Sequence, residues 1–214
     1  TKIATETAII TYAASDALSY SIGNILSYQG FEAFDATGLY QYSYSGQGGS
    51  PLYSASYAFG ACADYVTADY SLGFWVGDSG GSASTEYLFA YTGIEDVTLK
   101  FIYADDPTYE STNIWGSYDY GDFTFAFEYY DSEQLASGEE TDTMMFLVYK
   151  AFGDAGLTVR YVDGTDDDTD YDRLTLSPSY AFSDNVFGLV EFSYDELEDG
   201  TTSEEIAAEL IYSF

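Results

Sequence analysis

Apolar and polar side chains alternate with a period of two along most of this chain. In the final segment, one face carries Ile206, Ala208, Leu210, Tyr212 and Phe214. The same alternation recurs at 170–182, where apolar positions interleave with arginine, serine and threonine, and at 122–131. Because successive side chains of a β-strand point to opposite faces, this pattern predicts strands with one apolar and one polar face.

Division of the sequence by this alternation predicts about thirteen strands. They span 3–13, 17–28, 54–66, 69–77, 85–93, 97–105, 113–120, 122–131, 142–152, 156–164, 170–182, 185–195 and 204–214. Most are near the roughly 9 to 11 residues that a tilted strand needs to cross a bilayer, which exceeds the usual strand of about 5 to 6. The expected fold class is therefore all-β, an antiparallel up-and-down transmembrane β-barrel with about 13 strands in this chain and roughly 12 to 16 in the complete barrel.

The connections between these strands are expected to alternate in length. Short turns are expected at 14–16, 67–68, 94–96, 121, 153–155 and 183–184, and long polar loops at 29–53, 78–84, 106–112, 132–141, 165–169 and 196–203. Short turns on one rim and longer loops on the other are typical of outer-membrane barrels. The whole chain, 1–214, then forms a single β-barrel domain in which the loop 29–53 folds inward.

The parity of the expected strands bears on completeness. The last strand ends on the short-turn rim, whereas the first expected strand must begin on the long-loop rim. An even barrel with both ends on one rim needs at least one more strand before Thr1, so the sequence predicts an N-terminally incomplete barrel.

Composition excludes several classes of function. The chain has 37 acidic and five basic residues, a formal charge of -32, and no histidine. Five basic residues cannot build the patch that nucleic acids require. Without histidine, Ser-His-Asp and Cys-His catalysis and histidine-ligated zinc are unavailable, so Gly77-Asp78-Ser79-Gly80-Gly81, which matches the surroundings of a serine-protease nucleophile, is expected to be an ordinary connection. We expect no enzymatic activity.

If the apolar face contacts lipid, the polar face lines the interior. The candidate pore-lining residues are Lys100, Lys150, Arg160, Arg173, Glu32, Asp35, Asp64, Asp119, Glu128, Glu191 and Glu209. Lys150, Arg160 and Arg173 fall on three successive strands and predict a basic stripe, opposite Glu32 and Asp35 of the inward-folded loop. Such opposed charges determine which ions pass, and the excess of acidic over basic residues favours cations. In the alternative interpretation, these basic residues pair with neighbouring acids and rigidify the wall of a closed interior.

Two further features concern the surface. Asp166, Asp168 and Asp170 alternate like the oxygen ligands of a calcium loop, although Tyr171 stands where such a loop has glycine, and a solvated loop is the alternative. Tyrosine is abundant, at 24 residues, and gathers toward strand ends as in the aromatic girdles of membrane barrels. A soluble aromatic core and a sugar-binding row of rings are the competing interpretations.

Two stretches resemble a known family. Residues 7–24, followed by Gly30-Phe31-Glu32-Ala33-Phe34-Asp35 and Tyr42-Ser43-Tyr44-Ser45, resemble the OmpL-like β-barrel porins of Gram-negative outer membranes. The chain departs from that family at Asn24, where lysine is usual, and at Phe31, where tyrosine is common. The second stretch is 205–214, in which Leu210, Tyr212 and Phe214 resemble the carboxy-terminal signal for insertion into the outer membrane.

This resemblance implies an outer-membrane location and diffusive passage of small solutes or ions. Together with the charged interior, it predicts a porin that passively conducts ions and small hydrophilic solutes, with a preference for cations. The expected partners are outer-membrane lipid and the permeating solutes, and homo-oligomerisation is compatible with the sequence. No cofactor is expected beyond calcium at the acidic loops. The alternative is a closed structural or anchoring barrel with acidic, calcium-binding surface loops.

Overall fold

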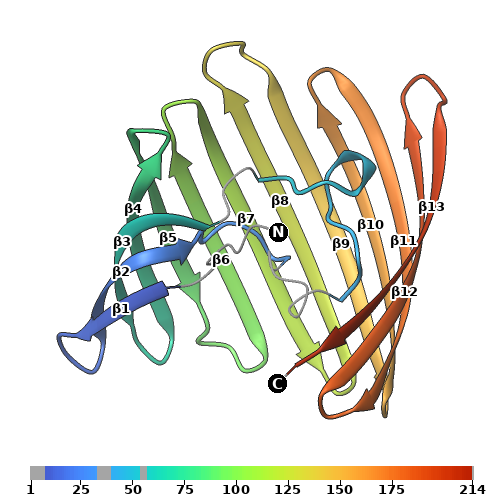
Figure 1. Ribbon diagram of the computed structural model, residues 1–214, viewed down its shortest axis with the longest axis horizontal. Helices are drawn as coiled ribbons and strands as arrows, with labels where there is room; N and C mark the ends of the chain where they lie inside the picture. The colour runs from blue at the N-terminus through green and yellow to red at the C-terminus, as the bar shows by residue number, and fades with distance from the viewer. Residues whose placement is uncertain (1–7, 33–39, 54–56, 214) are drawn as a thin grey trace.

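The computed structural model describes residues 8–32, 40–53 and 57–213 and consists of one 13-stranded antiparallel sheet (Figure 1). Each strand pairs with the next along the chain, so the order is β1 through β13 without a crossover. The strands are β1 (Ala8–Ala13), β2 (Leu18–Leu26), β3 (Tyr57–Val66), β4 (Tyr70–Ser79), β5 (Ser82–Tyr91), β6 (Val97–Asp105), β7 (Tyr109–Tyr120), β8 (Phe123–Gln134), β9 (Glu140–Phe152), β10 (Ala155–Asp166), β11 (Thr169–Ser183), β12 (Val186–Leu197) and β13 (Thr202–Tyr212). A short 3-10 turn, η2 (Gln47–Gly49), lies between β2 and β3. The predicted all-β, up-and-down architecture is confirmed.

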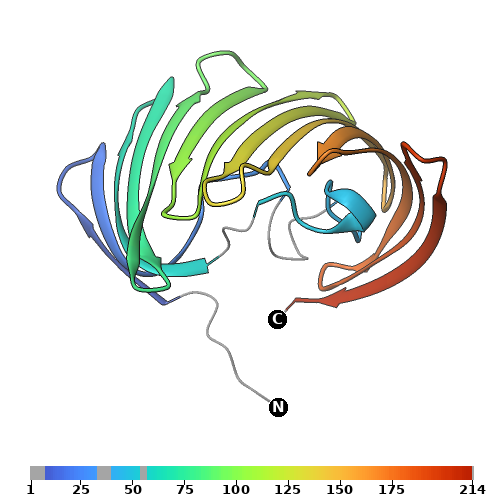
Figure 2. The same cartoon turned by 90° about the horizontal axis from the view of Figure 1, so that it is seen from above.

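The sheet curves strongly into a trough with β1 and β13 at its two edges (Figure 2). Within the described residues these two strands do not pair, so the sheet is not closed. The connection between β2 and β3 lies inside the concave face, and its described parts are 27–32 and 40–53. No helix among the described residues is long and apolar enough to cross a membrane.

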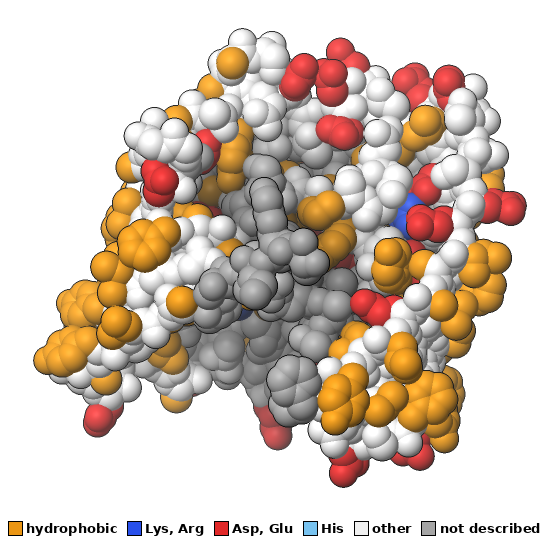
Figure 3. Space-filling model, viewed as in Figure 1, with side chains coloured by type: hydrophobic (Ala, Val, Ile, Leu, Met, Phe, Trp, Pro, Cys, Tyr) orange, Lys and Arg blue, Asp and Glu red, His pale blue; other side chains and the backbone are white. Residues whose placement is uncertain are grey.

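Burial along the strands is inverted relative to a soluble protein. In β11 the polar residues Arg173, Thr175 and Ser177 have no exposed surface, whereas Leu174 is 51% exposed and Tyr180 is 45% exposed. Forty large apolar or aromatic side chains are exposed on the described part of the molecule, far more than isolated surface residues would explain. Figure 3 shows apolar side chains along both flanks of the sheet. The apolar face of the alternating pattern is therefore the outer, convex face.

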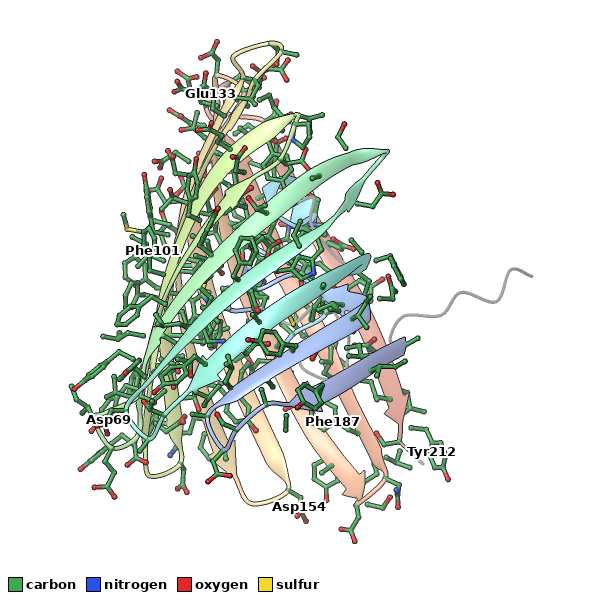
Figure 4. The ribbon with its side chains drawn as sticks, turned by 90° about the vertical axis from the view of Figure 1, so that its left-hand side faces the viewer. Asp69, Phe101, Glu133, Asp154, Phe187 and Tyr212 are labelled. Carbon is green, nitrogen blue, oxygen red and sulfur yellow. The ribbon has the colours of Figure 1, made fainter. Side chains whose placement is uncertain are left out.

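Acidic side chains are concentrated at one rim of the sheet, the upper one in Figure 3. Figure 4 places Glu133 at this rim, Asp69 and Asp154 at the opposite rim, and Phe101 between them on the outer surface. Along the outer face of β8, for example, the aromatic positions at Phe125 and Phe127 give way to Asp131 and Glu133. The outer face thus changes from apolar to acidic along the strand direction.

The expected contrast between a long-loop rim and a short-turn rim is wrong for five of the six expected long loops. Strands continue into them and leave only the connections 80–81, 106–108, 135–139, 167–168 and 198–201. In the turn 167–168, Asp167 and Asp168 have φ angles of 46° and 62° and close a tight hairpin. At the turn 80–81, the carboxylate of Asp78 accepts a hydrogen bond from the amide of Gly81 at 2.9 Å. The polar residues flanking these turns pair across the hairpin, and the sequence alone does not distinguish them from loop residues.

Candidate functional site

The connection between β2 and β3 lies on the concave face of the sheet and contacts strands in both the N-terminal and the C-terminal half of the sheet (Figures 1 and 2). We call residues 27–56 the inner loop and base its description on 27–32 and 40–53. Its first anchor, residues 27–31, contacts β3, β5, β7 and β8. Its second anchor, residues 40–45 together with Glu32, contacts β10, β11 and β12. The described parts of the inner loop therefore bind the concave face at two separate groups of strands.

The first anchor begins at Glu86 of β5, which is 1% exposed. One carboxylate oxygen of Glu86 accepts the Ser27 hydroxyl at 2.6 Å, and the other accepts the Tyr28 amide at 2.7 Å. The Tyr28 hydroxyl donates to Asp64 of β3 at 2.6 Å. Burial, with this hydrogen bond, raises the pKa of the Tyr28 hydroxyl, so it remains a neutral donor.

The first anchor continues on β7 and β8. The Gly30 amide donates to the Asn113 side-chain oxygen at 2.9 Å, and the Phe31 amide donates to Glu128 Oε1 at 3.1 Å. The Asn113 amide group also donates to Glu128 Oε1, at 2.7 Å. Gly30 has a φ of 94° and passes so close to the Tyr53 ring that a Cβ would overlap it, so this position needs glycine.

Arg160 of β10 is the centre of the second anchor. Its guanidinium forms an ion pair with Glu32 of the inner loop and donates to the carbonyl oxygens of Ser43 at 2.8 Å and Tyr44 at 3.0 Å. It also donates to the Thr175 hydroxyl at 3.1 Å. Arg160 has no exposed surface, and a buried arginine needs such a set of acceptors to offset its lost hydration.

Glu191 of β12 and Arg173 of β11 complete the second anchor. Glu191 accepts the Tyr42 and Ser43 amides at 2.8 and 2.9 Å. Arg173 donates to both oxygens of Asp195 at 2.7 and 2.6 Å and lies 3.4 Å from Glu191. Two arginines and several carboxylates therefore hold this half of the inner loop.

Aromatic rings pack between the inner loop and the wall. Phe31 meets Trp115 edge to face at a centroid distance of 5.5 Å, and Tyr40 lies 5.0 Å from Tyr149. Tyr53 meets Tyr130 edge to face at 5.6 Å. Edge-to-face pairs at these distances are favourable beyond the area that they bury. Burial raises the pKa of the Tyr53 hydroxyl well above its usual value.

The structure corrects the predicted basic stripe at Lys150. This residue lies on the outer face of β9, where its ammonium group stands 3.9 Å from the centroid of the Phe123 ring and 5.1 Å from that of Phe152. Its nearest carboxylate is Asp122 of the adjacent turn, at 4.0 Å. The buried neighbours Met145 and Leu147 occupy the inner face of the strand, so Lys150 cannot line the interior.

The other predicted basic residues lie on the inner face. Arg160 and Arg173 are fully covered by the inner loop, so they anchor it and do not line an open passage, as the wall-pairing alternative supposed. Lys100 of β6 is partly exposed and lies over the Trp115 ring at 4.7 Å. No carboxylate forms an ion pair with it in the part of the chain that the structure describes.

The predicted acidic residues fall into two groups. Glu32, Glu128 and Glu191 are buried against or within the inner loop. Asp64, Asp119 and Glu209 also lie on the inner face but keep some exposure. Asp35 lies outside the described residues.

The candidate calcium ligands do not converge. Asp166 lies on the face of β10 that carries buried Val162, Asp168 is in the turn, and Asp170 alternates with buried Tyr171 and so lies on the opposite face. Among the described residues, no three acidic or cysteine side chains are grouped so that they could hold a metal ion. In the expected insertion signal, Leu210 and Tyr212 are on the outer face, and Phe214 is outside the described residues.

Sequence reasoning missed three residues that hold the inner loop or its anchors, namely Glu86, Asn113 and Asp195. For Glu86 a signal was present. The aromatic residues Tyr87, Phe89 and Tyr91 mark one face of the expected strand 85–93 as apolar, which assigns Glu86 to the polar, inner face. For Asn113, the expected strand began at this residue, so no alternation preceded it.

No protein-family model matches the chain, and no curated protein sequence matches it. Several solved structures share its fold. A loop L8 deletion mutant of OmpT, an outer membrane protein of Vibrio cholerae, aligns with a TM-score of 0.71 at 15% identity over 93% of this chain and 77% of that chain. OccAB4 of Acinetobacter baumannii aligns with a TM-score of 0.69 at 10% identity over 93% and 63%, respectively.

An anion-selective porin from Comamonas acidovorans aligns with a TM-score of 0.61 at 13% identity, over 74% of this chain and 56% of that chain. This chain thus spans less than two thirds of the OccAB4 and Comamonas chains. At such low identity the comparison concerns the fold and does not extend to particular residues. The chain has the fold of outer-membrane β-barrel porins.

Proposed function

We propose that this protein is an outer-membrane channel through which ions and small hydrophilic solutes diffuse passively, without catalysis. The observation that carries the proposal is the inverted distribution of side chains, with an exposed apolar convex face and a charged, hydrogen-bonded concave face. An apolar outer band with a polar interior is the arrangement by which a membrane β-barrel satisfies both lipid and water. The porin-type fold supports the same proposal.

The inner loop narrows the passage in this proposal. Its described parts are hydrogen-bonded to the wall from β5 to β12, and Glu32 forms a buried ion pair with Arg160. A constriction of this kind brings the permeating solute close to the charges that remain exposed on the wall, and their field then acts over a short distance. Permeation is therefore expected to depend on the inner-face charges that the inner loop leaves uncovered.

Those uncovered charges favour cations. Arg160 and Arg173 are buried and paired, which leaves Lys100 as the partly exposed lysine of the described inner wall. Asp64, Asp119 and Glu209 remain partly exposed there. With a formal charge of -32 on the whole chain, the potential in the passage is negative and concentrates cations.

The test is the reversal potential of single channels in planar bilayers under a potassium chloride gradient. We expect a measurable current with a reversal potential that reports cation preference. Lys100→Gln shifts the reversal potential further toward the cation limit, whereas the matched substitution Lys150→Gln, on the outer face, leaves it unchanged. Anion preference, or equal shifts in the two variants, contradicts the proposed charge selection, and no current contradicts the channel.

A second function, that of a closed anchoring barrel, draws on the burial of the Arg160–Glu32 and Arg173–Glu191 ion pairs beneath the inner loop. Buried ion pairs of this kind also occur in interiors that conduct nothing. The same bilayer experiment distinguishes the two functions. A correctly inserted protein that never opens supports the closed barrel.

A further inference from the structure

A groove on the outer face of the sheet crosses β6, β7, β8 and β9. It has a volume of about 380 Å³ and an apolar lining. Its walls include the outward side chains of Val97, Leu99, Tyr118, Phe125, Phe127 and Val148. Gly116, which pairs with Leu99 on one side and Phe127 on the other, is also in the lining and adds no side chain to fill the groove. The volume falls within the roughly 300 to 1,000 Å³ of ligand-binding pockets.

A lysine lies at the end of this groove. Lys150 is on the same face of β9 as Val148, one outward position nearer the rim at which Figure 4 places Asp154. Its ammonium group stands over the Phe123 ring, which in turn stacks on the ring of Phe125 in the groove wall at a centroid distance of 5.7 Å. Successive outward positions of a strand are roughly 7 Å apart, so the groove begins one such step from the lysine.

Lys150 and its nearest carboxylate leave room for a third charged group. Lys150 Nζ is 4.0 Å from the carboxylate of Asp122, which is too long for a hydrogen bond, and the two side chains are 29% and 75% exposed. The ammonium group can therefore still donate, and the carboxylate can still accept. A zwitterion with its anionic group at Lys150 and its cationic group at Asp122 complements both charges.

The charge pair distinguishes this groove from another of the same size. A second apolar groove of about 380 Å³ lies on the outer face of β11, β12 and β13 and includes Val190 in its lining. Across the described part of the chain, Lys150 is the basic residue of the outer face, whereas Lys100, Arg160 and Arg173 lie on the inner face. Shape alone therefore does not separate the two grooves, and a ligand that carries charge selects the one beside Lys150.

We propose that the groove and the pair of Lys150 and Asp122 bind one phospholipid whose headgroup carries a primary ammonium, as in phosphatidylethanolamine. The lipid phosphate accepts from the Lys150 ammonium, the headgroup ammonium donates to the Asp122 carboxylate, and one acyl chain lies in the groove. Because bulk lipid offers the chain a similar apolar environment, the groove positions the lipid and the headgroup contacts supply the selection. This inference rests on the outer-membrane location and not on conduction.

The same contacts disfavour two other headgroups. In phosphatidylcholine the nitrogen carries three methyl groups and no N–H, so it cannot donate a hydrogen bond to Asp122. Phosphatidylglycerol has no cationic group for Asp122, and its negative charge is repelled by a chain with a formal charge of -32.

The test is native mass spectrometry of the full chain in detergent, titrated separately with phosphatidylethanolamine, phosphatidylcholine and phosphatidylglycerol of identical acyl chains. We expect the first bound lipid to be retained about threefold more with phosphatidylethanolamine than with either of the others, the scale of one partly exposed charged contact. Lys150→Gln and Asp122→Asn each lower phosphatidylethanolamine to the level of phosphatidylcholine. The matched changes Lys100→Gln, on the inner face, and Asp69→Asn, in another turn of the same rim, leave the preference intact.

A second pair of variants tests the groove itself. Val148→Trp places a large ring in the groove beside Lys150, and Val190→Trp makes the same change in the groove of β11, β12 and β13. The two valines are equally exposed, at 37%. We expect Val148→Trp to lower retention of phosphatidylethanolamine about threefold, because the acyl chain loses its place, and Val190→Trp to leave it unchanged.

The inference is overturned if the unsubstituted protein retains the three lipids equally or prefers phosphatidylglycerol, a comparison that needs no variant to fold. It is also overturned if Lys150→Gln and Lys100→Gln lower the retention of phosphatidylethanolamine equally, or if the two tryptophan variants act alike. Lipid preference without current in planar bilayers counts against the channel alone. Normal current without lipid preference counts against the lipid site alone.

Discussion

Arg160 shows at the level of one side chain how the interior handles charge. Within the described residues, its hydrogen bonds go to the inner loop and to Thr175 of the neighbouring strand. Its ion-pair partner Glu32 also accepts the amide and hydroxyl of Ser45 and the side-chain amide of Gln41. The pair therefore orders the chain around it, and removal of one partner leaves the other buried without compensation.

We predict that Arg160→Met destabilises the protein by about 3 to 5 kcal/mol, because Glu32 is left buried without its cation. Lys150→Met, on the outer face at the rim, is the matched control and costs at most about 1 kcal/mol, since its ion pair is long and partly exposed. Reversible urea unfolding in lipid vesicles, followed by tryptophan fluorescence, measures both. Equal losses contradict the anchoring role of Arg160.

At the level of single strands, alternation determines which face meets which environment. Outward residues of β11 such as Leu174 and Leu176 are exposed, and the inward residues between them are buried. A shift of register by one residue would exchange the two faces of a strand. The antiparallel register observed from β9 through β11 is continuous over nearly the whole length of these strands.

We predict that Leu176→Arg costs about 2 to 4 kcal/mol, as expected for a charge placed on the lipid face near the middle of the membrane. Leu135→Arg, in the turn 135–139, is also a change from an exposed leucine to arginine and changes stability by no more than about 0.5 kcal/mol. The same unfolding measurement compares them. Similar small effects at both positions contradict a lipid-facing β11.

The same alternation explains which parts of the fold the sequence predicts. Each of the thirteen observed strands corresponds to a predicted one, because most have a clear polar face. The error at Lys150 has a physical cause. Around 144–148 both faces of β9 are apolar, since Met145 and Leu147 pack on the inner side under the inner loop, and an apolar run on both faces leaves the phase of the strand undetermined.

At the level of the whole molecule, the inner loop joins distant parts of the chain. Phe31 contacts Glu128, and Tyr42 contacts Glu191, so its anchors span 97 and 149 residues of sequence, respectively. Sequence reasoning predicted that this loop folds inward and that Glu32 faces the arginines. It could not predict which wall residue meets which loop amide, because such pairs depend on the curvature of the sheet and leave no periodic signal.

The central claim is that the apolar convex face contacts hydrocarbon and the polar concave face contacts water. Spin labels at 98, 99, 100 and 101 of β6, introduced singly into a Cys62→Ser background in lipid vesicles, test it most directly. We expect the labels replacing Leu99 and Phe101 to collide with dissolved oxygen, and those replacing Thr98 and Lys100 with a water-soluble nickel chelate. Four labels with the same accessibility, or the opposite alternation, would contradict the account.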